Sequence, residues 1–259
     1  MRYTGRGFVV CLLLLALLAS LNACSLLGGR TQMPTRRKFV IQAGDLNLSL
    51  PDSERPYPFS VQLKKFEVLG FYDRNQIVFR LSEAEVKEDR WHIWAVRPSD
   101  MITGAVEQYF KDARLFSHVS QEFLDLRPDF IFTGTIEAIE RFDSGDLWFA
   151  HMAISMQMMD QGNQTVWTRK FEVKQQVYNQ DMVYTVETLS EILRHQMQLA
   201  ILDLDFKFLN IQHQREGRPL AGEKPLAEPA AMDTAATAAP PAGTADYEII
   251  PGKLAPAQP

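Results

Sequence analysis

Reactive side chains are few in this sequence, and their spacing does not form a catalytic site. The 259-residue chain has two cysteines and five histidines, and it contains no G-x-S-x-G, H-E-x-x-H or phosphate-binding glycine motif. The histidines lie far apart without the spacing of metal ligands: His92, His118, His151, His195 and His213. The sequence therefore predicts a protein that is not an enzyme and that holds neither metal nor cofactor.

The amino terminus has the pattern of a lipoprotein signal peptide. Two arginines precede an apolar run at residues 8–19, which is shorter than the roughly 20 residues that span a bilayer and is typical of a cleaved signal sequence. Leu21-Asn22-Ala23-Cys24 follows and resembles a bacterial lipobox, in which the cysteine becomes the first mature residue and receives lipid. We therefore expect a signal peptide at residues 1–23, lipidation of Cys24 and a polar tether at 24–35.

Cysteine use and charge agree with an envelope location. Cys11 is removed with the signal peptide, so an unmodified Cys24 would be an unpaired thiol in an oxidising compartment. Cleavage removes two of the 27 basic residues and leaves 25 against 32 acidic ones, a net charge of −7. This excess of acidic residues argues against nucleic acid as a partner. Ser25, rather than Asp, follows Cys24 and favours sorting to the periplasmic face of the outer membrane.

Residues 36–210 have the pattern of one α+β domain. A strand is expected at residues 37–42, another at Gln76–Arg80, an aromatic turn at Arg90–Trp94 and a short edge strand at His118–Phe123. An antiparallel meander follows, with strands ending near Phe142, Met158 and Val177 and a turn between each pair. In its first strand Phe130 to Ala138 alternate as a core face, and Arg141 is expected to face away.

Two long helices complete the expected domain. One starts at Ser99, which follows Pro98 and is a suitable N-cap, and the other covers residues 182–208 with a continuous apolar stripe. The predicted fold is a mainly antiparallel sheet with both helices packed on one face.

The last segment, residues 211–259, is expected to be a disordered tail. Eight of the 14 prolines lie there with a dozen alanines, and large apolar side chains are scarce. Tyr247 begins its one short apolar stretch, which is either a docking peptide or ordinary tail.

The stretch from Asn75 to Val119 contains three short motifs in order: Phe79-Arg80, Trp94-Ala95 with Pro98, and Leu115-Phe116 with Val119. In the spacing of these motifs it resembles the auxiliary lipoproteins of bacterial ABC-type lipid transport systems. The resemblance implies a fold like the amino-terminal domain of TolB and partnership with a mammalian-cell-entry (MCE) protein and its ABC permease. It also implies contact with phospholipid and self-association into rings. A binding module of another envelope machine, for secretion or outer-membrane assembly, is the alternative.

Contact residues for a partner or a lipid can be suggested from residue type. Trp91 and Trp94, with Arg97 nearby, have the mixture of aromatic and arginine side chains that anchors interfaces, although either tryptophan could instead belong to the core. Met159 is expected on the face of its strand opposite the other methionines, where an adaptable apolar side chain could contact lipid. Tyr247 is the candidate in the tail.

Overall fold

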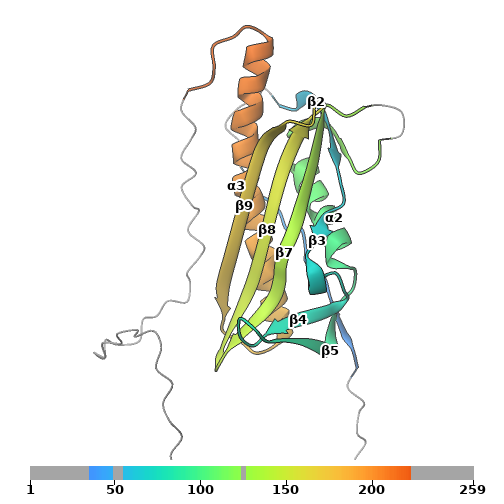
Figure 1. Cartoon of the computed structure of the whole chain (residues 1–259). Coiled ribbons are helices and arrows are strands. Elements are labelled where there is room, and N and C mark those ends of the chain that lie inside the picture. The colour runs from blue at the N-terminus through green and yellow to red at the C-terminus, as the bar shows by residue number, and fades with distance from the viewer. Residues whose placement is uncertain (1–34, 49–54, 124–126, 223–259) are drawn as a thin grey trace, which may run out of the picture. The chain divides into compact units, whose positions relative to one another are not determined.

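The computed structural model describes residues 35–48, 55–123 and 127–222 (Figure 1). The elements are β1 (Arg37–Phe39), β2 (Tyr57–Leu63), β3 (Glu67–Val68), the 3-10 helix η1 (Gly70–Tyr72), β4 (Gln76–Arg80), β5 (Val86–Trp94), α2 (Pro98–Ala113), β6 (Phe116–Ser120), β7 (Phe130–Ser144), β8 (Leu147–Asp160), β9 (Thr165–Val177) and α3 (Met182–Arg215). The strand predicted at Gln76–Arg80 and all three strands of the meander are confirmed.

The sheet is organised around β7. Along one edge of β7, β8 pairs antiparallel over its whole length, and β9 continues the meander beyond β8. Along the other edge, three short strands pair parallel with successive parts of β7: β2 with Phe130–Phe132, β3 with residues 135 and 136, and β4 with residues 140–142. β5 and then β1 extend the sheet beyond β4, and β6 extends it beyond β2.

The α+β class is confirmed, but the sheet is mixed rather than mainly antiparallel. Five pairs of strands are parallel among the described residues, namely β1 with β5, β2 with β6, and β2, β3 and β4 with β7. These pairs join segments that are distant in sequence, so local alternation of side chains carries no signal for their direction. Likeness to the TolB amino-terminal domain stays a prediction.

The predicted aromatic turn at Arg90–Trp94 is wrong, because these residues form the second half of β5. The turn lies earlier, in the Glu-rich stretch between β4 and β5, where the Leu81 amide donates to the Glu85 carbonyl. Strands β4 and β5 therefore form a hairpin, and β1 adds to its outer side.

A β-bulge at Glu137 changes which side chains of β7 face the core. Ile136 pairs with Ile154 and Ala138 with Ala153, so one extra residue lies on β7. The alternation predicted from Phe130 to Ala138 consequently shifts by one position. Ile139 takes the core side, and Arg141, expected to face away, is buried. The adjacent apolar residues Ala138 and Ile139 are the sequence signal for this bulge.

The N-cap of helix α2 lies two residues before the predicted one. Arg97 is the N-cap and Pro98 occupies the first helical turn, where its missing amide hydrogen costs no helical bond. Ser99, predicted as the cap, lies inside the helix. Its carbonyl accepts a hydrogen bond from Thr103 Oγ1, and Thr103 Oγ1 in turn accepts from the Phe66 amide at 2.9 Å. This pair of bonds fixes α2 to the chain that enters β3.

Helix α3 has 34 residues and is longer than predicted at its carboxyl end. The Asp181 side chain caps it by accepting a hydrogen bond from the Val183 amide at 3.0 Å. The predicted apolar stripe is buried against the sheet and α2: Val186, Leu189, Leu193, Met197, Ala200 and Leu204. The helix continues past Phe208 to Arg215.

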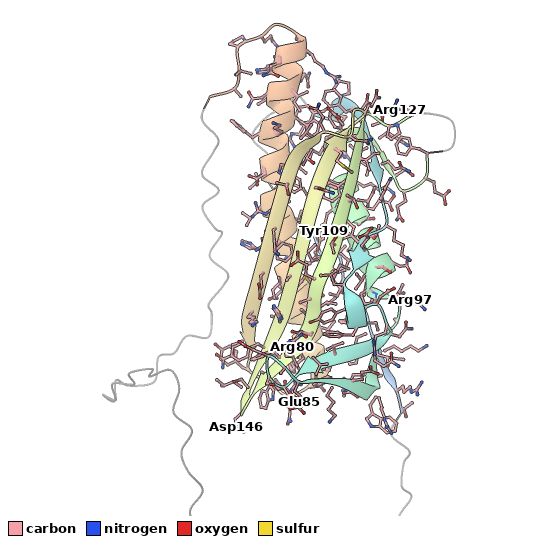
Figure 2. The ribbon with its side chains drawn as sticks, in the orientation of Figure 1. Arg80, Glu85, Arg97, Tyr109, Arg127 and Asp146 are labelled. Carbon is pink, nitrogen blue, oxygen red and sulfur yellow. The ribbon has the colours of Figure 1, made fainter. Side chains whose placement is uncertain are left out.

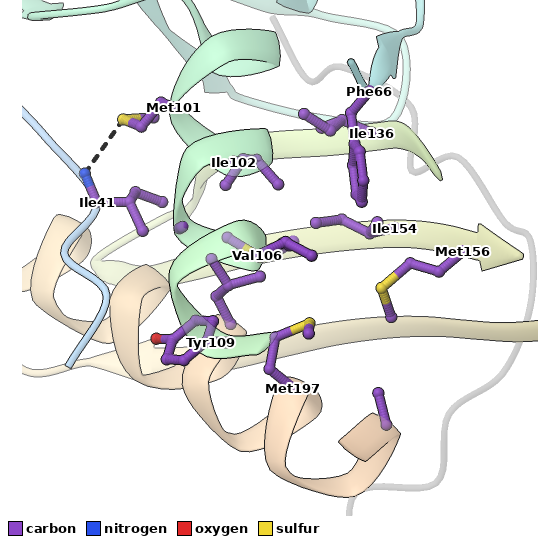
Figure 3. Close-up of a cluster of buried hydrophobic side chains, with 14 of the residues drawn as sticks. Ile41, Phe66, Met101, Ile102, Val106, Tyr109, Ile136, Ile154, Met156 and Met197 are labelled. Carbon is purple, nitrogen blue, oxygen red and sulfur yellow. Dashed lines mark hydrogen bonds between the residues drawn. The ribbon is translucent and has the colours of Figure 1, made fainter. Parts of the chain in front are cut away.

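The core lies between the two helices and one face of the sheet (Figure 3). Ile102 and Val106 of α2 and Met197 of α3 meet Ile136 and Ile154 of the sheet. The even-numbered methionines of β8, Met152, Met156 and Met158, are also buried, as packing alone would require. Gly134 on β7 leaves the space that the Phe66 ring fills, because a Cβ there would lie 2.5 Å from that ring.

Candidate functional site

Trp91 and Trp94 lie on one strand but have different environments. Trp94 is 1% exposed, and its backbone amide donates to the Asn75 carbonyl at 2.6 Å. Trp91 is 45% exposed, and its amide donates to Asp89 Oδ1 at 2.6 Å. Positions three apart on a strand point to opposite faces, so the structure separates the two rings. Trp94 belongs to the core, and Trp91 is available at the surface.

Arg97 lies at the start of α2, and its guanidinium is largely exposed (Figure 2). Its nearest acidic partner is Asp73, at 3.9 Å between Nη1 and Oδ2. Asp73 follows η1 and also accepts a long hydrogen bond from Ser99 Oγ. An exposed ion pair of this length contributes little to stability, so the Arg97 side chain remains available for contact with a partner.

Met159 lies far from Trp91, near the carboxyl end of β8, where it pairs with Ile131. It is half-buried and lines a hollow of about 360 Å³. Most other side chains around this hollow are polar: Thr133, Thr135, Ser155, Gln157 and Thr168. Such a lining offers hydrogen bonds rather than an apolar surface for acyl chains. Two other predicted residues, Cys24 and Tyr247, lie outside the described residues.

A buried polar cluster around Glu140 was not predicted from the sequence. Glu140 is fully buried on β7 and accepts three hydrogen bonds: from Tyr72 Oη at 2.6 Å, from Arg80 Nε at 2.6 Å and from His151 Nδ1 at 2.8 Å. Arg80 also donates to Tyr72 Oη, and the other ring nitrogen of His151 lies 3.1 Å from Glu172. Arg80 is placed near one end of the sheet (Figure 2).

The cluster controls the ionisation of its members. Burial alone would raise the pKa of Glu140, but hydrogen bonds from His151, Arg80 and Tyr72 outweigh it and lower that pKa below its ordinary value. Burial, with the Glu140 hydrogen bond, raises the pKa of the Tyr72 hydroxyl. The Glu140 hydrogen bond raises the pKa of Arg80. The carboxylate therefore stays ionised and paired.

The cluster links several elements of the fold through one carboxylate. Its three donors occupy three of the roughly four lone-pair positions of the buried Glu140 carboxylate. Tyr72 comes from η1, Arg80 from β4 and His151 from β8, so one carboxylate holds three elements on β7. The register of the β7–β8 hairpin could have revealed one pair of this cluster from the sequence, because the turn at Gly145-Asp146 places Glu140 opposite His151.

Two absences hold for the part of the chain that the structure describes. Among residues 35–48, 55–123 and 127–222, no group of three or more His, Cys, Asp or Glu side chains is placed to hold a metal ion. In the same residues, no helix combines the length and apolar character that crossing a membrane requires.

Comparisons with known proteins identify similar chains. The family model described as "ABC-type transport auxiliary lipoprotein component" matches residues 47–200. No curated protein matches the chain. A crystal structure of a protein from Xanthomonas campestris, assigned to family model DUF330, is 18% identical with a TM-score of 0.53, covering 71% of this chain and 96% of that one. A crystal structure of an uncharacterized protein is 12% identical with a TM-score of 0.52, covering 66% and 99%. At these identities the two structures show a shared fold.

Proposed function

Because the chain belongs to the family of ABC-type transport auxiliary lipoprotein components, we propose that it is the outer-membrane-anchored periplasmic component of an MCE-type phospholipid transport system. The observation that carries the proposal is the family match over residues 47–200, which extends from the chain before β2 into α3. In the proposal, Cys24 carries the lipid anchor, residues 24–35 form a tether, and the folded domain docks the MCE protein.

The proposed role is binding rather than catalysis. The Glu140 cluster gathers the ionisable groups that an enzyme would need. Its carboxylate, however, is fully buried and already accepts three hydrogen bonds from neighbouring side chains. The domain would hold the outer-membrane end of a lipid path and present a fixed surface to the rest of the system. A likeness to the amino-terminal domain of TolB would agree with such a docking role.

Trp91 and Arg97 are the proposed contacts with the MCE protein. Both side chains are exposed, and tryptophan and arginine are enriched at interface hot spots. Arg97 directly precedes the buried Pro98, and Trp91 lies three residues before the buried Trp94 on β5. Trp94 is then a positioning residue, because its burial fixes β5 beneath Trp91. Met159 and Tyr247 stay in the proposal as weaker contacts with phospholipid or protein.

Self-association is part of the same proposal. The described sheet is open: β9 pairs with β8 alone, and β6 pairs with β2 alone. Edge strands present unpaired backbone amide and carbonyl groups that a second copy can use. Sedimentation of the lipid-free mature chain would test this, and a single monomeric species at every concentration would remove self-association from the proposal.

Photocrosslinking in living cells tests the proposed partner. A photoreactive residue is placed in turn at Trp91, Arg97, Met159 and Tyr247, and at Gln214 at the end of α3 as an exposed control. We expect an MCE-type protein to be captured from positions 91 and 97 but not from 214. Capture of only secretion or assembly components from positions 91 and 97 would replace the proposed function by that of another envelope machine.

A further inference from the structure

Exposed apolar side chains gather along one end of the sheet. Leu81 follows β4, Val86 begins β5, Leu147 begins β8 and Tyr178 follows β9, and all four are exposed, with Tyr178 at 77%. We call these four residues the apolar rim.

Strand pairing makes the members of the apolar rim neighbours across the sheet. Val86 pairs with Arg80, the residue before Leu81, and Arg80 pairs with Phe142 near the end of β7. Leu147 pairs with Ser144 across the β7–β8 turn, and Trp148 pairs with Val177, the residue before Tyr178. The rim residues therefore lie at the adjacent ends of β5, β4, β7, β8 and β9.

The opposite end of the meander is polar. In the β8–β9 turn, residues 160–164, a side chain of the turn satisfies the backbone amides. Asp160 Oδ1 accepts hydrogen bonds from the amides of Gly162 at 2.7 Å and Gln164 at 2.9 Å. Arg127 donates to the Gln161 carbonyl beside it. Beyond the carboxyl end of α3, Leu220 is the one large apolar side chain of the described residues that is exposed.

The chain enters the domain at the end that carries the apolar rim. The described residues begin at Thr35, two residues before β1 starts, and β1 pairs with β5. Arg37 of β1 forms an ion pair of 3.0 Å with Asp181, three residues after Tyr178. Figure 1 shows β1, the β4–β5 hairpin, the β7–β8 turn and the start of α3 at the same end of the sheet.

The length of chain ahead of Thr35 limits what this end can reach. The eleven residues from Cys24 span at most about 40 Å when fully extended. Helix α3, which runs from the rim to the opposite end, is itself about 50 Å long for its 34 residues. With Cys24 in a membrane, the rim can touch the bilayer directly, whereas the opposite end reaches it only if the domain lies on its side.

Charges near the rim have both signs. Glu83, Glu85 and Asp146 are exposed at the two hairpin turns, and Lys87 and Arg90 are exposed on β5. A surface with this mixture is not attracted strongly to anionic lipids, but it can pair with the ammonium and phosphate of a zwitterionic headgroup. Tyrosine and leucine beside such charges suit the boundary between headgroups and acyl chains.

We propose that the apolar rim rests in the headgroup region of the zwitterionic phospholipid leaflet that holds the Cys24 lipid. The inference rests on the lipid anchor of the proposed function, but it does not depend on an MCE partner. It gives the domain a defined orientation, with the β8–β9 turn and the end of α3 directed away from the membrane.

Site-specific quenching tests the orientation. The mature lipidated protein is reconstituted in vesicles of the zwitterionic lipids phosphatidylethanolamine and phosphatidylcholine, with one added cysteine per variant: Leu147→Cys, Tyr178→Cys, or Leu220→Cys as the control at the opposite end. Each is labelled with an environment-sensitive dye, and quenchers are attached to the lipids. We expect dye at positions 147 and 178 to shift to shorter wavelength and lose most of its emission, and dye at 220 to keep it.

The outcomes separate the orientation from the anchor. Equal emission at positions 147, 178 and 220 would show that the rim faces water or a protein partner, and it would overturn the inference while leaving the proposed function intact. The parent protein without an added cysteine should take up no dye, because lipid occupies the Cys24 thiol. Labelling of the parent would show an unmodified Cys24 and would overturn both the inference and the proposed anchor.

Discussion

The two edges of β7 are built on different principles. On one edge, β8 and β9 form a meander whose pairing follows from two short turns and from residues close in sequence. On the other edge, β2, β3 and β4 lie up to about 70 residues before their partners on β7 in the sequence, and each pairs with β7 over only two or three residues. Their positions therefore depend on side-chain contacts. Long hairpins are fixed by their own register, whereas short parallel strands need specific polar and steric contacts.

The largest expected loss of unfolding free energy comes from removing the Glu140 carboxylate, which binds side chains at the edge of β7 that pairs with the short parallel strands. Glu140→Ala leaves the Arg80 and His151 side chains without their buried partner, and breaking a buried pair in this way typically costs about 3–5 kcal/mol. Urea unfolding of the full chain carrying Cys24→Ser would measure it. Glu172→Ala is the matched control, because Glu172 also bonds His151 but is mostly exposed, and its loss should cost less than about 0.5 kcal/mol.

Acid should weaken the same edge in a milder way. Because the folded-state pKa of Glu140 is lowered, its contribution is fully present above the ordinary glutamate value of 4.5 and is lost as pH falls through the lower folded-state value. The unfolding free energy of the wild type should therefore approach that of Glu140→Gln below pH 4.5 and exceed it at neutral pH. Stability curves that stay parallel over this range would contradict the role given to the carboxylate.

A steric test addresses the approach of β3 to β7. Gly134→Ala would place a methyl group 2.5 Å from the Phe66 ring, and overpacking of this kind usually costs about 1–3 kcal/mol. Adding Phe66→Leu to the variant should recover part of the loss. Gly104→Ala in α2 meets nothing within 4 Å and should be neutral or stabilising, so an equal loss at both glycines would disprove the close contact.

The smallest expected loss of stability comes from substitutions in the β7–β8 turn of the meander. Gly145 in the β7–β8 turn has φ of 59°, a left-handed conformation in which alanine costs about 1–2 kcal/mol and asparagine less. Thermal unfolding of Gly145→Ala and Gly145→Asn would compare the two. We expect no change in pairing, because the long register of β7 with β8 is fixed at fourteen positions.

This difference between the edges also explains what could be predicted. Ile154, Met156 and Met158 alternate with the polar residues Ser155 and Gln157, so their strand, its turns and its core face follow from the sequence. The parallel partners of β7 do not, since no local pattern connects Val61 to Phe130 or Val78 to Glu140. Residues 90–94, which were predicted to form an aromatic turn, belong instead to strand β5, because they pair with β1 and β4.

The candidate site was predicted less completely than the fold. Residue type suggested both Trp91 and Trp94, but only the strand geometry shows that Trp94 is buried and Trp91 is not. Glu140 was missed because its burial depends on Tyr72 and Arg80, which come from elements far from it in sequence. The roles of Cys24, Arg97, Met159 and Tyr247 stay predictions.

The placement of β1 has a mechanical consequence. A pull on the chain ahead of Thr35 acts first on three residues of β1 paired with β5 and on the ion pair between Arg37 and Asp181. Behind them, the Ile41 amide contacts Met101 of α2, and the Gln42 amide donates to Ser190 of α3. Force on the chain ahead of Thr35 therefore passes from a short strand to both long helices, so the domain resists being unfolded from its amino-terminal side.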